Sequence, residues 1–211
     1  MKIAVIAANG RTGRVFVQAA LRAGHQVQAG VHTSSNMKAV PGLSFIECDA
    51  TQESEVTKLI QGQDAVVSFI GHVRGAPPDV QTKATKVVVS AMSKLNQKRL
   101  VSLTGTGVRF PNDKITLTDR LLNMSIGIID PKRVVDGINH AEVLKNSDLD
   151  WTIIRVLKLT SGERGRFTLQ PNGPTKPFVS REEAAQAVLE VLEQHQFIRM
   201  APIISKAVNA T

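Results

Sequence analysis

The stretch AANGRTGR, residues Ala7–Arg14, follows an apolar run at Lys2–Ala7 and opens an amphipathic segment at Thr12–Ala23. In such a strand–turn–helix, glycines let the backbone approach a phosphate, and the helix N-terminus directs free N–H groups and partial positive charge at it. Gly10 is placed for close backbone approach, and Gly13 for close packing of the helix on the strand. We therefore predict that this turn binds a dinucleotide pyrophosphate; the alternative is a tight turn without a ligand. The predicted contact residues are Ala8, Asn9, Gly10, Arg11, Thr12 and Gly13.

The rest of the chain repeats this alternation of short apolar runs and amphipathic segments. The predicted strands are Lys2–Ala7, Gln26–His32, Leu43–Glu47, Asp64–Gly71, Leu100–Thr104, Trp151–Val156 and Phe197–Ile204. The predicted helices are Thr12–Ala23, Glu53–Gln61, Pro77–Asn96, Gly137–Asn146 and a last one that Ser180 caps and that ends at Gln194. Strands and helices in this order form βαβ units, which build a parallel sheet covered on both faces. We predict a single domain over 1–211 with a Rossmann-type α/β fold, a doubly wound parallel sheet in three layers.

Two stretches rich in turn formers follow predicted strand ends, residues 105–131 and residues 157–177. Ligands bind beside the carboxyl ends of the strands in open parallel sheets. These stretches are therefore predicted to be substrate-side loops, the second of them in a small C-terminal substrate region.

Composition limits the classes of partner. Of the 211 residues 42% are apolar and 21% charged, which is typical of a globular domain. No apolar run approaches the roughly 20 residues that span a bilayer, and the start of the chain does not resemble a secretory signal. The single cysteine, Cys48, fits a reducing compartment, so the expected location is cytoplasmic. We expect a dinucleotide and a small molecule as partners, in a monomer or homodimer, with no membrane partner and no metal.

The net charge of +8 favours a polyanionic partner. However, no block of five like charges occurs, and the chain has one Trp and no Tyr for base stacking. Nucleic-acid binding is therefore the least favoured function. The alternative explanation of the net charge is that the basic side chains are spread over solvated faces.

The end of the second predicted strand indicates which dinucleotide binds. An NAD site usually places Asp or Glu there, on the ribose hydroxyls. This strand instead ends in His32 and is followed by Ser34 and Lys38, with Arg11 within possible reach. These side chains suit a 2′-phosphate, so we predict NADP, with NAD as the alternative. Asp49, after the third strand, could accept a hydrogen bond from the adenine amino group or could be a turn residue.

Several segments together resemble a known family. The turn AANGRTGR, the step Cys48-Asp49-Ala50, the run DAVVSFIG at Asp64–Gly71 and LDWTIIRV at Leu149–Val156 are similar to atypical short-chain dehydrogenases/reductases. The best match is the NmrA-like and biliverdin/flavin-reductase-like branch, whose helix start resembles FVSREEAA at Phe178–Ala185. The resemblance implies NAD(P)H binding on a Rossmann fold. It also implies cofactor contacts at Ala50, Ile70, Gly71 and Thr104.

The chain departs from the family pattern at informative positions. The family usually has Gly where Ala7 stands, Arg where His32 stands and Pro where Val156 stands. Ala7 is tolerable only if its φ is negative. The Tyr-x-x-x-Lys pair of the wider superfamily, whose Tyr protonates the carbonyl oxygen, is absent because the chain has no Tyr.

Three side chains are candidates for the remaining chemistry. His140 is on the predicted helix that carries the lysine in the wider superfamily, although the branch has its histidine one position later. His72 follows the fourth strand directly and could instead be a surface histidine. Thr104 ends the fifth strand, where the family has Ser or Thr near the nicotinamide, with Gly105 and Gly107 opening space. Its alternative role is to cap the strand end.

Two functions remain open from the sequence. One is an NAD(P)H-dependent reductase of a small, quinone- or flavin-like acceptor, which takes hydride without a dedicated tyrosine acid. The other is a redox-sensing or regulatory protein that binds the dinucleotide without turnover. A sugar-nucleotide epimerase is less favoured, since that chemistry normally uses the missing tyrosine.

Overall fold

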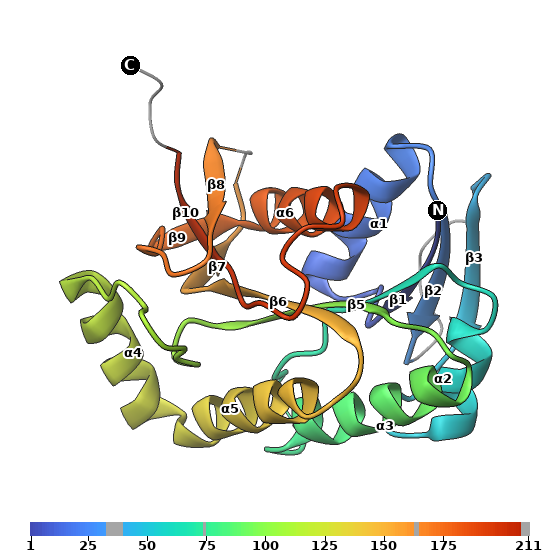
Figure 1. Cartoon of the computed structure of the whole chain (residues 1–211), viewed down its shortest axis with the longest axis horizontal. Helices are drawn as coiled ribbons and strands as arrows, with labels where there is room; N and C mark the ends of the chain where they lie inside the picture. Colours follow the sequence, from blue (N-terminus) through green and yellow to red (C-terminus); the bar gives the residue numbers. More distant parts are fainter. Residues whose placement is uncertain (33–39, 74, 163–164, 208–211) are drawn as a thin grey trace.

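The computed structural model describes residues 1–32, 40–73, 75–162 and 165–207, in the arrangement of Figure 1. The strands of the large sheet are β1 Lys2–Ile6, β2 Gln26–Val31, β3 Leu43–Glu47, β4 Ala65–Ser68, β5 Arg99–Gly105, β6 Asp150–Val156, β8 Phe167–Gln170 and β10 Ile203–Lys206. A two-stranded sheet contains β7 Lys158–Thr160 and β9 Phe178–Ser180. The helices are α1 Arg11–Arg22, α2 Glu53–Ile60, α3 Val80–Lys94, α4 Leu117–Ile129, α5 Pro131–Lys145 and α6 Arg181–Glu193. No helix in this part of the chain is long and apolar enough to cross a membrane.

The strand order of the large sheet is β3-β2-β1-β4-β5-β6-β10-β8. All neighbours pair in parallel except β8, which is antiparallel to β10. The order reverses between β1 and β4, because the chain first builds outward to β3 and then crosses back. In open parallel sheets the loops on either side of such a switch point diverge, and ligands bind there.

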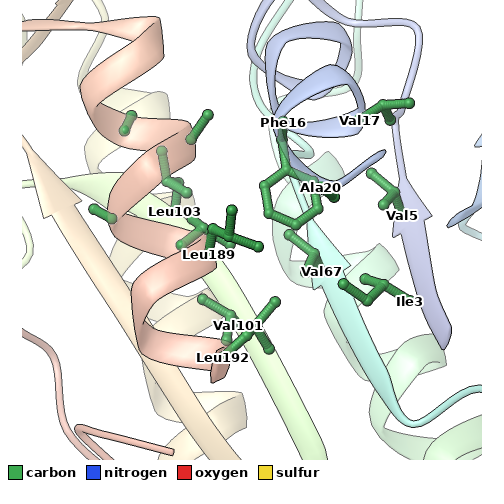
Figure 2. Packing of buried hydrophobic residues seen from close by; sticks show 14 of the residues in the cluster. Ile3, Val5, Phe16, Val17, Ala20, Val67, Val101, Leu103, Leu189 and Leu192 are labelled. Carbon is green, nitrogen blue, oxygen red and sulfur yellow. The ribbon is translucent and has the colours of Figure 1, made fainter. Parts of the chain in front are cut away.

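Helices cover both faces of the sheet. In Figure 1, α1 and α6 lie above it and α2, α3 and α5 below it, while α4 extends at the left-hand end beside α5. Each face buries its own apolar cluster, since the central strands have no solvated face. Figure 2 shows part of the upper cluster, where Phe16 of α1 and Leu189 of α6 pack above Val67 and Leu103 of the sheet.

The predicted doubly wound parallel sheet is confirmed, with two corrections. Residues 105–131 are not loop throughout, because Thr116 caps the backbone N–H of Asp119 and α4 begins there. Residues 157–177 likewise contain β7 and β8. The last strand begins at Ile203 rather than Phe197, since Phe197 and Arg199 have positive φ angles that interrupt extended backbone.

Candidate dinucleotide-binding site

The glycine turn connects β1 to α1 with an unusual backbone at Ala7. Its φ is 58°, in the left-handed region, and the Gly10 N–H donates to the Ala7 carbonyl at 3.0 Å. The condition of a negative φ is therefore wrong: Ala7 adopts the strained conformation that glycine would adopt freely. Strain retained at a turn that carries a candidate ligand site is consistent with a functional constraint.

Gly13 provides the close contact between α1 and the end of β1. A Cβ at Gly13 would lie 2.8 Å from the Ala8 carbonyl oxygen and 2.9 Å from the Ala8 Cα, and nearer still to the Ala7 oxygen. All three obstacles are backbone atoms, which cannot rotate away. A side chain at this position would therefore move the helix N-terminus relative to the turn.

The N-terminus of α1 has the properties of an anion site. Gly10 is its N-cap, no side chain caps the helix, and its first turn contains no acidic residue. Asn9 has its carbonyl occupied, accepting from Arg14 Nε at 2.8 Å. The first N–H groups of the helix and its dipole are therefore not compensated by a side chain, which suits a pyrophosphate.

Arg181 adds a positive charge near the one that Arg11 contributes at this end of α1. The sequence analysis did not select it. It begins α6, which packs alongside α1 (Figure 1). Partial burial and the nearby Arg11 guanidinium hold the pKa of Arg181 below its usual value. Its Nη1 donates to Ser161 Oγ at 3.1 Å, and within the described ranges neither arginine has a carboxylate partner. Two guanidinium groups whose charges act on each other and that have no acidic partner fit phosphate oxygens. The sequence does show that Arg181 directly follows Ser180, the cap of the last helix. It does not show that this helix packs against α1.

The ends of β2 and β3 bring His32 near Asp49. Asp49 Oδ1 accepts from Thr51 N at 2.9 Å and from Thr51 Oγ1 at 2.8 Å. These hydrogen bonds, with a smaller effect of His32, hold the Asp49 pKa below its usual value. Asp49 thus stabilises the turn that contains the half-buried Ala50. Its predicted hydrogen bond to the adenine amino group stays a prediction. Ser34 and Lys38 lie outside the described residues.

The predicted nicotinamide side of the site is formed after β4 and β5. Gly71 is exposed and has no atom within 4 Å of an added Cβ, and Ile70 before it is half-buried. Thr104 is buried, with its Oγ1 3.0 Å from the position of a Cβ on Gly137. Gly107 does not open space as expected, since Asn123 of α4 packs against it.

His140 lies in the core rather than in a cleft. The side chain is 1% exposed, and its Nε2 is 3.1 Å from Ser102 Oγ in β5. Burial lowers its pKa to about 4, although the charge of Asp136 acts in the opposite direction. A neutral imidazole enclosed against Ser102 fits a structural role better than that of an acid in the site.

His72 pairs with Asp136, a residue that sequence reasoning also missed. His72 Nε2 lies 2.9 Å from Asp136 Oδ2, and the two side chains are 14% and 1% exposed. The carboxylate is held at the start of α3: it accepts from the N–H groups of Gln81 and Thr82, each at 2.9 Å, and from the Thr82 hydroxyl. Because 64 positions separate His72 from Asp136, no local pattern could have indicated this pair.

His72 Nε2 lies within ion-pair distance of the buried carboxylate but is not aligned with it for a hydrogen bond. The other ring nitrogen, Nδ1, is therefore the candidate to meet a ligand. A histidine beside a buried carboxylate is a common arrangement in acid–base sites.

Comparisons with known proteins give the family of the chain. A family model described as NAD(P)H-binding matches residues 7–195. The uncharacterized protein YwnB of Bacillus subtilis is 24% identical over 206 residues, which cover 92% of each chain.

Solved structures show the same fold. A short-chain dehydrogenase/reductase from Veillonella parvula, solved in complex with NADP, superposes with a TM-score of 0.82 at 16% identity, covering 97% of this chain and 94% of that one. A protein provisionally named an NADH-flavin reductase, from Streptococcus pneumoniae, has a TM-score of 0.79 at 22% identity, covering 98% and 100%.

Proposed function

Because the chain belongs to the NAD(P)H-binding family, we propose that it is an NADPH-dependent reductase of a small planar acceptor of the quinone or flavin type. The observation that carries this proposal is the pair formed by His72 and Asp136. A protein that only binds a dinucleotide has no need of an imidazole next to a buried carboxylate beside the switch point of the sheet.

The residues present fit an NADPH molecule. The uncapped N-terminus of α1 and the close contact at Gly13 support the pyrophosphate, as family membership implies. His32, Arg11 and Arg181 provide basic groups, and no carboxylate ends β2. A 2′-phosphate is favoured by this charge distribution, whereas an NAD site would need an acid on the ribose.

The bound dinucleotide supplies a hydride to the acceptor. We assign to His72 the matching proton, delivered from Nδ1 to the acceptor oxygen or nitrogen, so that hydride and proton together give the two-electron reduced product. Asp136 places a carboxylate 2.9 Å from Nε2, and solvent returns the proton to the ring. Thr104 contributes a hydroxyl at the end of β5, and the open space beside Gly71 admits the acceptor.

The second candidate function is a dinucleotide-binding sensor without turnover. The observation that favours it is the absence of any Tyr, and hence of the superfamily's acid. The two functions differ in one measurable respect, which is whether NADPH is consumed.

The experiment measures NADPH oxidation with a water-soluble naphthoquinone and with riboflavin as acceptors. We expect turnover, and we expect His72→Asn to lower kcat about 100-fold, the lower range for losing a general acid, with unchanged NADPH affinity. His195→Asn is the matched control, since His195 is an exposed histidine far from β4 in sequence. NADPH binding without oxidation of either acceptor would favour the sensor. Turnover that is insensitive to His72→Asn would remove His72 from the mechanism.

A further inference from the structure

A normal surface helix turns its apolar side toward the protein and its polar side toward solvent. Helix α4 has the reverse arrangement. Asp119 is its one residue classed as buried, and Asp119 accepts from Thr106 Oγ1 and from both terminal nitrogens of Arg109. Asn123, one turn later, donates to Thr106 Oγ1 at 3.0 Å. The polar side of α4 therefore faces the protein.

The apolar side of α4 faces outward. Leu117, Leu121, Met124 and Ile128 are 77%, 60%, 57% and 76% exposed. Their spacing of four, three and four residues places them on one stripe of the helix. Ile129 follows at 82% exposure. Single exposed apolar residues are ordinary, but a contiguous stripe that polar residues could have occupied marks a contact surface.

Basic residues accompany this stripe. Lys114, Arg120, Lys132 and Arg133 are exposed, and none has an ion-pair partner among the residues that the structure describes.

The carboxylates of the same segment are engaged elsewhere. Asp119 is buried against Arg109, Asp136 is buried against the start of α3, and Asp130 caps α5 through the Arg133 N–H. The outward surface of 114–133 is thus apolar and positively charged.

We propose that α4 and the first turn of α5 bind an anionic lipid surface. The apolar stripe would enter the boundary between headgroups and acyl chains while the flanking basic side chains meet phosphate groups, as in interfacial helices. Figure 1 shows α4 at one end of the molecule, beside α5. Sequence analysis predicts no membrane partner; the outward orientation of the apolar stripe changes that expectation.

A second copy of the chain fits this surface less well. A two-fold contact brings the same patch of each copy together, so the four cations of one would face the four cations of the other. An anionic bilayer instead complements both properties of the surface. This inference does not depend on the proposed reductase activity, and its test contains neither cofactor nor acceptor.

The experiment is flotation of the full chain with vesicles. We expect binding to vesicles of equal parts phosphatidylcholine and phosphatidylglycerol, little binding to phosphatidylcholine alone, and release at about 1 M salt, where charges are screened within about 3 Å. The double variant Leu121→Asp/Ile128→Asp should bind at least about tenfold less, because both side chains leave the apolar phase. Ile198→Asp, at another exposed apolar position, is its control and should bind normally.

Charge reversal gives an independent test that leaves the apolar stripe intact. Lys132→Glu/Arg133→Glu should weaken binding about thirtyfold, given the usual effect of basic residues at anionic membranes. Arg22→Glu/Lys206→Glu changes the net charge equally, away from α4 and α5, and should retain binding within about threefold. Absence of wild-type binding, or equal binding of both charge variants, would overturn the proposal. So would a dimer by light scattering that Leu121→Asp/Ile128→Asp separates into monomers, since copies of the chain would then cover the stripe.

Discussion

The buried imidazole of His140 predicts that the protein loses stability in mild acid. Its pKa is about 4 in the folded chain, against an ordinary value of 6.5. Between these values the unfolded chain binds the proton and the folded chain does not, so the free energy of unfolding falls as the pH falls. The difference of about 2.5 units corresponds to about 3 kcal/mol in total, of which about 2 kcal/mol is lost between pH 7.5 and pH 5.

Urea unfolding can measure this effect through Trp151, the one tryptophan of the chain, which is 4% exposed and lies in β6. Carboxylates titrate over the same range, so the informative quantity is the difference between wild type and His140→Gln. Glutamine has no proton to gain and can still hydrogen-bond Ser102. We expect the variant to lose about 2 kcal/mol less than wild type between pH 7.5 and pH 5.

His195→Asn is the control for removing any histidine. His195 is exposed and its φ is 49°, which asparagine tolerates. This variant should follow the wild-type pH dependence. If His140→Gln also followed the wild-type curve, folding would not lower the pKa of His140. The residue would then be protonated at pH 5 in the folded protein, and its assignment as a neutral core histidine would be wrong.

Further predictions concern the glycine turn, the cofactor and a buried ion pair. Gly13→Val should lower NADPH affinity at least about 100-fold, measured by titration of NADPH fluorescence, because its Cβ meets the backbone of Ala8; unchanged affinity would exclude this turn as the binding site. His32→Asp should weaken NADPH by repulsion of the 2′-phosphate and spare NADH, and a wild-type preference for NADH of about tenfold (1.4 kcal/mol) would refute the NADP assignment. Asp113→Asn should lower the free energy of unfolding by about 3 kcal/mol, since it leaves the fully buried Arg155 without its carboxylate; a loss below about 1 kcal/mol in urea would show that the carbonyls around Arg155 suffice.

Local patterns were sufficient for the fold. The turn at Gly10 and Gly13, the alternation of strands and helices and the capping box of Ser180 and Glu183 all depend on residues a few positions apart. Such features follow from backbone sterics and from the period of apolar residues, which each segment carries by itself. The parallel sheet then follows, because βαβ connections allow few other arrangements.

Helix α4 shows where local patterns fail. Its apolar residues have helical spacing, but the turn formers around them favour a loop. The spacing of apolar residues also does not show which side of a helix packs against the protein. The buried hydrogen bonds of Asp119 fix that side, and they form only when Arg109 and Thr106 fold back on it.

The sequence alone determined an NAD(P)H-binding α/β domain, and it predicts the segment that begins the cofactor site. The tertiary structure alone decided which polar side chains come close in space: His72 lies beside Asp136, Arg181 is near enough to Arg11 to feel its charge, and His140 is enclosed against Ser102. The physical reason is that a side chain's chemistry depends on its burial and its neighbours in space. These neighbours come from segments that only the packing of α3, α5 and α6 on the sheet brings together.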